Sequence, residues 1–267
     1  MTVTRNRRVF LPVFGGMVVL SWFLLWAWSR SPYSRYLEHG TWLDPGPVAF
    51  LCNAVPGGQV LVPALIHTVG WLLMIFAMML PTTLPLVDSF QRMTSQRDNG
   101  SQLVALVVFG YVSVWTVFGL VAHGLDSLVL ESVSRTPWLA FHGWVLGALV
   151  MAGAGLFQFS ALKYHCLEKC RTPLGFIMEH WSGRAQRWQA FLLGVNHGAF
   201  CVGCCWALML LMFVVGTGSI GWMLALGAIM AMEKNLPWGR QLSAPLGVFL
   251  LEAACVTVMI NGTPISE

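Results

Sequence analysis

Apolar stretches of about 20 residues recur along the chain, which is the length an α-helix needs to cross the hydrocarbon core of a bilayer. Seven such stretches can be counted, and the last two are short. We therefore predict an all-α fold, a polytopic transmembrane helix bundle with about seven spans, or six if the last span lies only at the membrane interface. One domain, residues 1–267, is expected to contain them all. The expected spans are Val9–Trp28, Val60–Leu80, Gln102–Ala122, Pro137–Phe159, Gln189–Val215, Ile220–Met232 and Pro245–Ile260.

The composition excludes a soluble globular protein. Hydrophobic residues make up 57% of the chain and charged residues only 10%, whereas soluble domains carry about 25% charged residues. The net charge of +4 does not come from a basic cluster on a soluble face, so nucleic acid is not an expected partner. The lipid bilayer is the expected partner.

The basic residues predict the orientation of the bundle. A cytoplasmic N-terminus places twelve of the 15 Lys and Arg residues inside, which satisfies the positive-inside rule. Lys163 and Lys234 are counted among these inner residues, and Glu233 beside Lys234 is expected to mark the inner interface. The expected location is the inner (cytoplasmic) membrane of a bacterium, as a multi-pass protein.

The fifth predicted span carries soft metal ligands on one face. Three cysteines follow His197 at offsets of 4, 7 and 8 residues, namely Cys201, Cys204 and Cys205. On a helix these offsets place all four residues within an arc of roughly 100°. Gly194 and Gly198 form a GxxxG pair on the same helix and predict close approach to a neighbour, so that this face points into protein. Thiolate and imidazole ligands favour Cu(I) and Zn(II).

A second cysteine pair follows the fourth predicted span. Cys166 and Cys170 lie one helical turn apart, so both thiols can bind one ion. If the fifth span starts near Gln189, Cys201 lies about 18 Å along the helix axis, far from Cys166 at the inner surface. We therefore favour two separate metal stations along a path over one shared site.

Other ligand-type residues form a possible second metal site or path. His67, Met74 and Met78 lie on one face of the second span, and Met212 continues the cysteine face by one turn. Copper proteins use histidine and methionine ligands, but packing of these methionines in the core is the favoured alternative.

Three further residues share the expected depth of His67, near the outer surface. They are His123, Asp126 and His142, which could form an imidazole and carboxylate site or could each be separate interface residues. Glu252 lies within the seventh span, where a carboxylate is costly unless it is paired. It is expected to be a buried charge that faces protein, with a partner in this chain or in another subunit.

Four segments resemble a known family. The chain is similar, from about Ser31 to Asn235, to a bacterial family of uncharacterised proteins described as predicted metal-binding integral membrane proteins. The most specific part is CxxxC combined with HxxxCxxCC. The resemblance implies membrane residence and metal binding and fixes no reaction. The segments are AMMLPTTLPL (77–86), YHCLEKCRTPLGFIMEHW (164–181), NHGAFCVGCCWALMLLM (196–212) and MEKN (232–235).

These observations favour a metal-binding integral membrane protein that holds or delivers copper, or less favourably zinc, through its cysteines and His197. Another membrane protein or a metalloenzyme complex would be the partner. One alternative is an accessory subunit of a larger membrane enzyme, with a structural cysteine cluster. Others are a metal transporter, ranked lower because Glu252 is the only deep charge expected, and a thiol redox protein. The chain by itself is not expected to be an enzyme, since no substrate cleft accompanies His197 and Cys201.

Overall fold

The computed structural model describes residues 2–31, 58–215 and 219–262, and every regular element in these ranges is a helix. The prediction of an all-α fold is therefore confirmed for the described residues. The elements are α1 (Thr2–Ser29), α3 (Gly58–Met74), the π-helix η4 (Ile75–Met79), the 3₁₀-helix η5 (Pro81–Thr83), α4 (Leu84–Thr94), α5 (Gly100–Arg135), α6 (Pro137–Phe141), α7 (Trp144–Phe157), α8 (Ala161–Arg171), α9 (Pro173–His180), α10 (Gln186–Val215), α11 (Ile220–Asn235), the 3₁₀-helix η6 (Gly239–Leu242) and α12 (Ser243–Gly262).

Several of these helices are compatible with a membrane protein. Five stretches of the described chain are long and apolar enough to cross a bilayer, and α7 with α8 would be a sixth if this pair, bent by 64°, forms one span. Helix α11 has only 16 residues. A seventh span and a cytoplasmic N-terminus stay predictions. The five stretches are Pro12–Ser29, Leu61–Met79, Gly100–Arg135, Gln186–Val214 and Gly239–Gly262.

Helices α5 and α10 pack closely because each presents glycine to the other. A Cβ atom added at Gly194 of α10 would collide with the carbonyl oxygen of Val107, and one added at Gly110 of α5 would collide with that of Phe191. The predicted close approach of the cysteine-bearing helix is thus confirmed, and the neighbour at Gly194 is α5. This contact turns the cysteine face of α10 into the bundle.

The helix after α3 is interrupted at Pro81. Proline has no N–H to donate to the carbonyl of Ala77, four residues earlier, and the indole Nε1 of Trp22 on α1 donates to this carbonyl instead, at 3.1 Å. Directly before Pro81 the backbone forms a π-turn, in which the Leu80 N–H donates to the Ile75 carbonyl at 2.9 Å. The 3₁₀-turn η5 follows it. The break stays within the packed core, where Ile75 and Met79 are fully buried.

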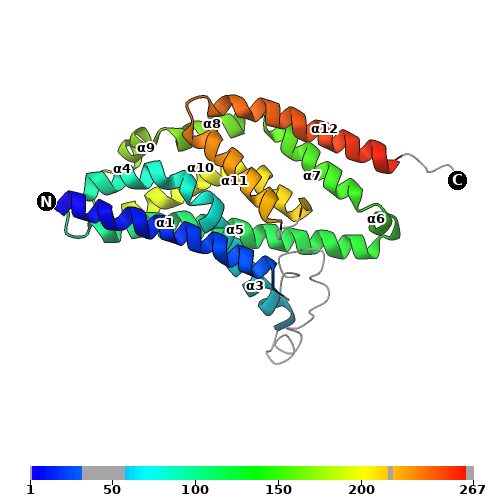
Figure 1. The fold of residues 1–267 in the computed structure, drawn as a ribbon, viewed down its shortest axis with the longest axis horizontal. Helices are drawn as coiled ribbons and strands as arrows, with labels where there is room; N and C mark the ends of the chain where they lie inside the picture. Colours follow the sequence, from blue (N-terminus) through cyan, green and yellow to red (C-terminus); the bar gives the residue numbers. More distant parts are fainter. Residues whose placement is uncertain (1, 32–57, 216–218, 263–267) are drawn as a thin grey trace.

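Helix α11 contacts helices from several parts of the chain. It packs against α1, η4, η5, α8 and α10, while α12 runs beside α7 (Figure 1). The bend between α7 and α8 follows Gln158, and Ser160 caps the new helix by accepting from the Lys163 N–H at 3.1 Å. Because of this bend, α8 packs against both α10 and α11.

Candidate functional site

Four cysteine side chains from α8 and α10 gather inside the bundle, and we refer to Cys170, Cys201, Cys204 and Cys205 as the thiol cluster. The Sγ atom of Cys204 lies 3.4 Å from that of Cys205 and 4.0 Å from that of Cys170. The Cys201 side chain interacts with those of Cys204 and Cys205. The three cysteines of α10 are at most 1% exposed, and Cys170 is partly exposed. All described cysteines are free thiols.

The expected separation of the two cysteine groups is wrong, because Cys170 lies beside Cys204. That expectation placed Cys166 at the inner surface, far from Cys201 in the middle of the fifth span. The 64° bend instead turns α8 against α10, so that Cys170 reaches Cys204. Cys166 is buried one turn away and packs on Gly203, where an added Cβ would lie only 2.6 Å from its Sγ atom.

A lysine and a tyrosine contact the thiol of Cys201. The Lys234 ammonium donates to Cys201 Sγ at 2.9 Å and to Thr82 Oγ1 at 3.1 Å. The Tyr111 hydroxyl lies 3.0 Å from the same sulfur and 3.3 Å from the carbonyl oxygen of Met79, at the π-turn. Lys234 is 5% exposed and Tyr111 2%. The helix break at Pro81 therefore supplies part of the wall around Cys201.

A second buried polar group lies on the other side of α11. Lys163 and Glu233 form an ion pair with an Nζ to Oε1 distance of 2.7 Å, and their side chains are 0% and 1% exposed. Gln158 accepts from the same ammonium, and Ser243 donates to the same carboxylate oxygen at 2.7 Å. Lys163, Glu233 and Lys234 are therefore buried in the protein, and their expected places on the inner side of the membrane stay a prediction.

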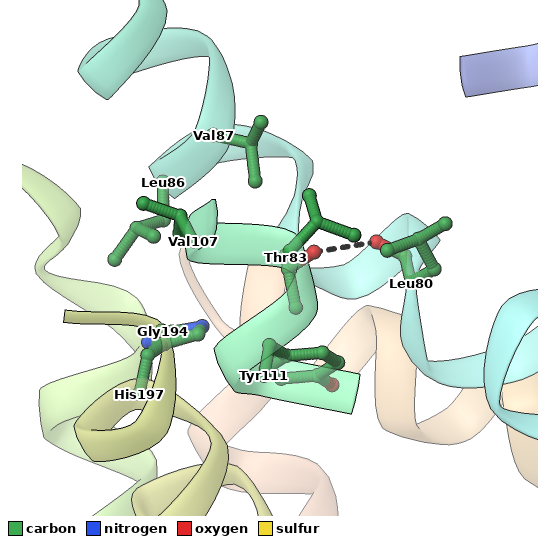
Figure 2. A pocket seen from close by; sticks show the side chains of 9 residues that line it. Leu80, Thr83, Leu86, Val87, Val107, Tyr111, Gly194 and His197 are labelled. Atoms are coloured by element: carbon green, nitrogen blue, oxygen red, sulfur yellow. Dashed lines mark hydrogen bonds between the residues drawn. The ribbon is translucent and has the colours of Figure 1, made fainter. Parts of the chain in front are cut away.

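His197 lies one turn before Cys201 and borders a small cavity. Its ring packs on Tyr111 and Phe176, with centroids 5.8 and 5.5 Å away. Its Nδ1 atom is buried without a hydrogen bond from the described residues. The cavity, between α10, α5 and the helix break, has a volume of about 10 Å³, and Figure 2 shows His197 and Tyr111 among its lining residues. That is about the space of one water molecule.

The predicted second histidine site is only partly assembled. His67 and His123 stack with ring centroids 4.4 Å apart. Asp126 follows on α5 and is partly exposed. His142 stacks on Trp138 at 4.5 Å and its Nδ1 atom lies 2.7 Å from the carbonyl oxygen of the same residue. Parallel stacking aligns ring faces, whereas a shared metal would need the nitrogen lone pairs to converge.

The remaining candidates divide between the core and the surface. Met74, Met78 and Met212 are at most 2% exposed and belong to the main hydrophobic core, which agrees with the packing alternative. Glu252 is exposed on α12. It is therefore not buried against the described residues of this chain, because α12 turns its other face to α7, and a partner in another subunit stays a prediction.

Residues that the sequence analysis missed complete the surroundings of the thiols. Tyr111 carries no signal beyond being a tyrosine in an apolar span, and Thr82 none beyond its place beside a proline. Lys234 gave a signal in the MEKN segment, where a cation directly ends an apolar stretch. Its depth depends on how far α11 reaches into the bundle.

The thiol cluster offers paired ligands rather than a complete cage. Within residues 2–31, 58–215 and 219–262, no group of three or more His, Cys, Asp or Glu side chains is arranged to hold a metal ion. Two sulfurs bound to one ion at about 2.3 Å in tetrahedral geometry lie about 3.8 Å apart. The distances from Cys204 to Cys205 and to Cys170, 3.4 and 4.0 Å, bracket this spacing.

A protein-family model matches most of the chain. The family model PpoB2, described as copper chaperone, matches residues 68–257, which include the thiol cluster, Tyr111 and Lys234. No curated protein and no solved structure matches the chain. The match agrees with the resemblance to a metal-related family and extends over well over half of the 267 residues. The chain belongs to the PpoB2 copper chaperone family.

Proposed function

We propose that the protein is an integral membrane copper chaperone that carries Cu(I) as cargo on the thiol cluster and delivers it to another membrane protein or a metalloenzyme complex. The observation that carries the proposal is the approach of Cys170 on α8 to Cys204 on α10, with 4.0 Å between their sulfur atoms. These residues are 34 positions apart in the chain, and only the bend before α8 brings them together.

The composition of the site favours Cu(I) over Zn(II). Thiolates are soft ligands that select Cu(I). Two of them bind this ion in near-linear geometry, for which the sulfur atoms of Cys170 and Cys204 would move slightly apart from their 4.0 Å spacing. Structural zinc sites almost always use four ligands in tetrahedral geometry, and the described residues offer no such set. His197, close to Cys201 but packed between Tyr111 and Phe176, is left as a candidate for a transient ligand.

The exposure of the four thiols suggests a direction for cargo exchange. Cys201, Cys204 and Cys205 are buried, whereas Cys170 is partly exposed near the end of α8. An incoming or outgoing ion would therefore exchange ligands at Cys170 first and reach Cys204 from there. A partner protein would approach this end of the bundle.

The test is Cu(I) binding by the full chain purified in mild detergent under reducing conditions, measured in competition with a chromophoric Cu(I) chelator. Cys204→Ser and Cys170→Ser should each weaken binding by more than the roughly 10–100-fold that changes outside the ligand sphere cost. Cys255→Ser is the matched control, because this exposed thiol lies on α12. It should bind as the wild type does.

Two results would overturn the proposal. One is wild-type affinity in both Cys204→Ser and Cys170→Ser, and the other is X-ray absorption of the copper-loaded protein with no sulfur neighbours. Tryptophan fluorescence checks that the variants are folded, and Cys204→Ala provides a second substitution if serine disturbs the dry interior.

Copper transport is the second candidate function, and two observations favour it. Transporters commonly place interrupted helices and buried charges around their binding site. Here the π-turn and the α7–α8 bend border the thiol cluster, and Lys163, Glu233 and Lys234 are buried. Transport was ranked low because Glu252 was the only deep charge expected, whereas these three charged residues are buried in the protein. Cu(I) accumulation in proteoliposomes that contain only this protein would support transport, and binding without accumulation would leave the chaperone proposal.

A further inference from the structure

We propose that Lys234 balances the charge of bound Cu(I) and thereby makes the thiol cluster select a monovalent over a divalent ion. The inference rests on the proposed function and adds a basis for its metal specificity. It assigns Lys234 a role as a specificity-determining residue beside the ligands.

The first step is that Lys234 carries a positive charge with no carboxylate partner among the described residues. Its ammonium group contacts Cys201 Sγ and Thr82 Oγ1, at 2.9 and 3.1 Å. The ion pairs found in the described ranges all use other residues. A buried cation is costly unless it is paired, so this side chain lies where an anionic partner would be most favourable.

The second step is the position of this charge relative to the thiols. The ammonium of Lys234 lies 2.9 Å from Cys201 Sγ, and Cys204 and Cys205 follow Cys201 by one turn on the same face of α10. Burial of all three cysteines keeps water away, and in such surroundings charges a few ångströms apart interact far more strongly than in water. The lysine therefore acts on the cluster as a whole.

The third step is a charge count for the metal complex. Metal binding deprotonates the thiols that serve as ligands. Two thiolates with Cu(I) carry one net negative charge, which the ammonium of Lys234 cancels. Two thiolates with Zn(II) are neutral, so the same ammonium would leave one positive charge in a dry interior. A dry interior favours the neutral combination of two thiolates, Cu(I) and the Lys234 ammonium. The site should therefore prefer the monovalent ion to the divalent one.

Lys163 provides the comparison within the same bundle. It is buried, as Lys234 is, but Glu233 already neutralises it at 2.7 Å. Lys163 thus has no remaining charge with which to stabilise an anionic complex. Only Lys234 should affect metal selectivity.

The experiment compares Cu(I) and Zn(II) affinities of the full-length protein in mild detergent, each measured by competition with a chelator of that metal. Lys234→Met should weaken Cu(I) binding, and it should leave Zn(II) binding unchanged or tighter. The ratio of the two affinities should fall by about tenfold or more, as expected for losing a charge near the ligands in a dry site. Lys234→Arg should keep a ratio close to that of the wild type.

A paired substitution is the matched control. Lys163→Met combined with Glu233→Met removes a buried lysine together with its counter-charge and should leave the ratio of affinities unchanged. Lys234→Gln is a second neutral variant, which keeps an amide donor near Cys201 and Thr82, and it should lower the ratio as Lys234→Met does.

The results separate this inference from the proposed function. A wild-type protein that binds no Cu(I) overturns the proposed function. A wild-type protein that binds Cu(I), with an unchanged affinity ratio in folded Lys234→Met and Lys234→Gln, overturns the inference and leaves the function in place. An equal fall in the ratio in the paired control would also overturn it, because the effect would then not be specific to Lys234.

Discussion

Glu233 and Lys234 are neighbours on α11, yet they belong to two buried polar groups of different character. Glu233 faces α8 and α12, where Lys163 neutralises it and Ser243 donates to it. Lys234 faces α10 and the helix break, where it meets a thiol and a hydroxyl group. One group is a closed ion pair, and the other holds a cation beside a thiol and a hydroxyl group, with no carboxylate partner among the described residues.

The difference separates a structural role from a binding role. A balanced ion pair with all its hydrogen-bond partners fixes the positions of α8, α11 and α12, and it gains nothing from a further charge. An unbalanced cation beside thiols gains from an anionic metal complex. Residues of equal burial can therefore have different functions, and the partner of each charge indicates which.

The largest loss of stability is expected when one partner of the Lys163–Glu233 ion pair is removed. Glu233→Ala leaves the Lys163 ammonium buried and unpaired, which should lower the free energy of unfolding by about 3–5 kcal/mol. Unfolding in detergent, followed by circular dichroism, measures this loss. Lys163→Met with Glu233→Met should restore most of it. A single variant as stable as the wild type would show that the pair does not hold these helices.

A smaller loss is expected where α10 meets α5, on the side of the thiol cluster. Gly194→Ala forces a Cβ atom against the Val107 carbonyl, and overpacking of this kind costs about 1–3 kcal/mol. The shift should also separate Tyr111 from Cys201 and leave the Lys163–Glu233 pair intact. Gly124→Ala is the control, because no atom outside its own helical turns lies within 4 Å of the added Cβ. Equal stability of both alanine variants would contradict the close packing.

Removal of one hydroxyl group should have a still smaller effect. Tyr111→Phe loses the contacts with Cys201 Sγ and the Met79 carbonyl, and the cost should be about 0.5–1.5 kcal/mol. Both partners keep another hydrogen bond, from Lys234 and Thr82 respectively. Tyr164→Phe, whose ring faces Arg240 at 5.1 Å, is the control. Thermal unfolding of the two variants compares them, and a loss of several kcal/mol in Tyr111→Phe would mean that the hydroxyl does more than these two contacts.

The smallest effect concerns an exposed ion pair, in contrast to the buried one. Lys169 donates to Glu179 at 2.7 Å and lowers the pKa of this carboxyl group. A carboxyl group with a lowered pKa in the folded state stabilises the protein above its ordinary pKa, and the contribution is lost as the pH falls through the lowered value. Glu179→Gln should therefore be slightly less stable than the wild type at neutral pH and equal to it in acid. The difference should also vanish in high salt.

The prediction of the fold from sequence succeeded where it depended on long apolar runs. Helices α5 and α10 contain the third and fifth predicted spans, Gln102–Ala122 and Gln189–Val215. The prediction of the fold was incomplete at the two places where the backbone departs from regular α-helical hydrogen bonding. The π-turn before Pro81 and the bend after Gln158 depend on donors from distant helices and on neighbouring packing, and a hydropathy pattern contains neither.

The sequence by itself determined the helical class, the apolar spans and the cysteine face of α10, because helical periodicity and side-chain polarity are local properties. The tertiary structure alone decided that Cys170 joins Cys204, that Lys234 reaches Cys201 and that Glu252 faces outward. These outcomes depend on a 64° bend, on the depth of α11 and on which side of α12 meets α7. Each is set by the packing of residues far apart in the chain, which the spacing of residues along the sequence does not predict.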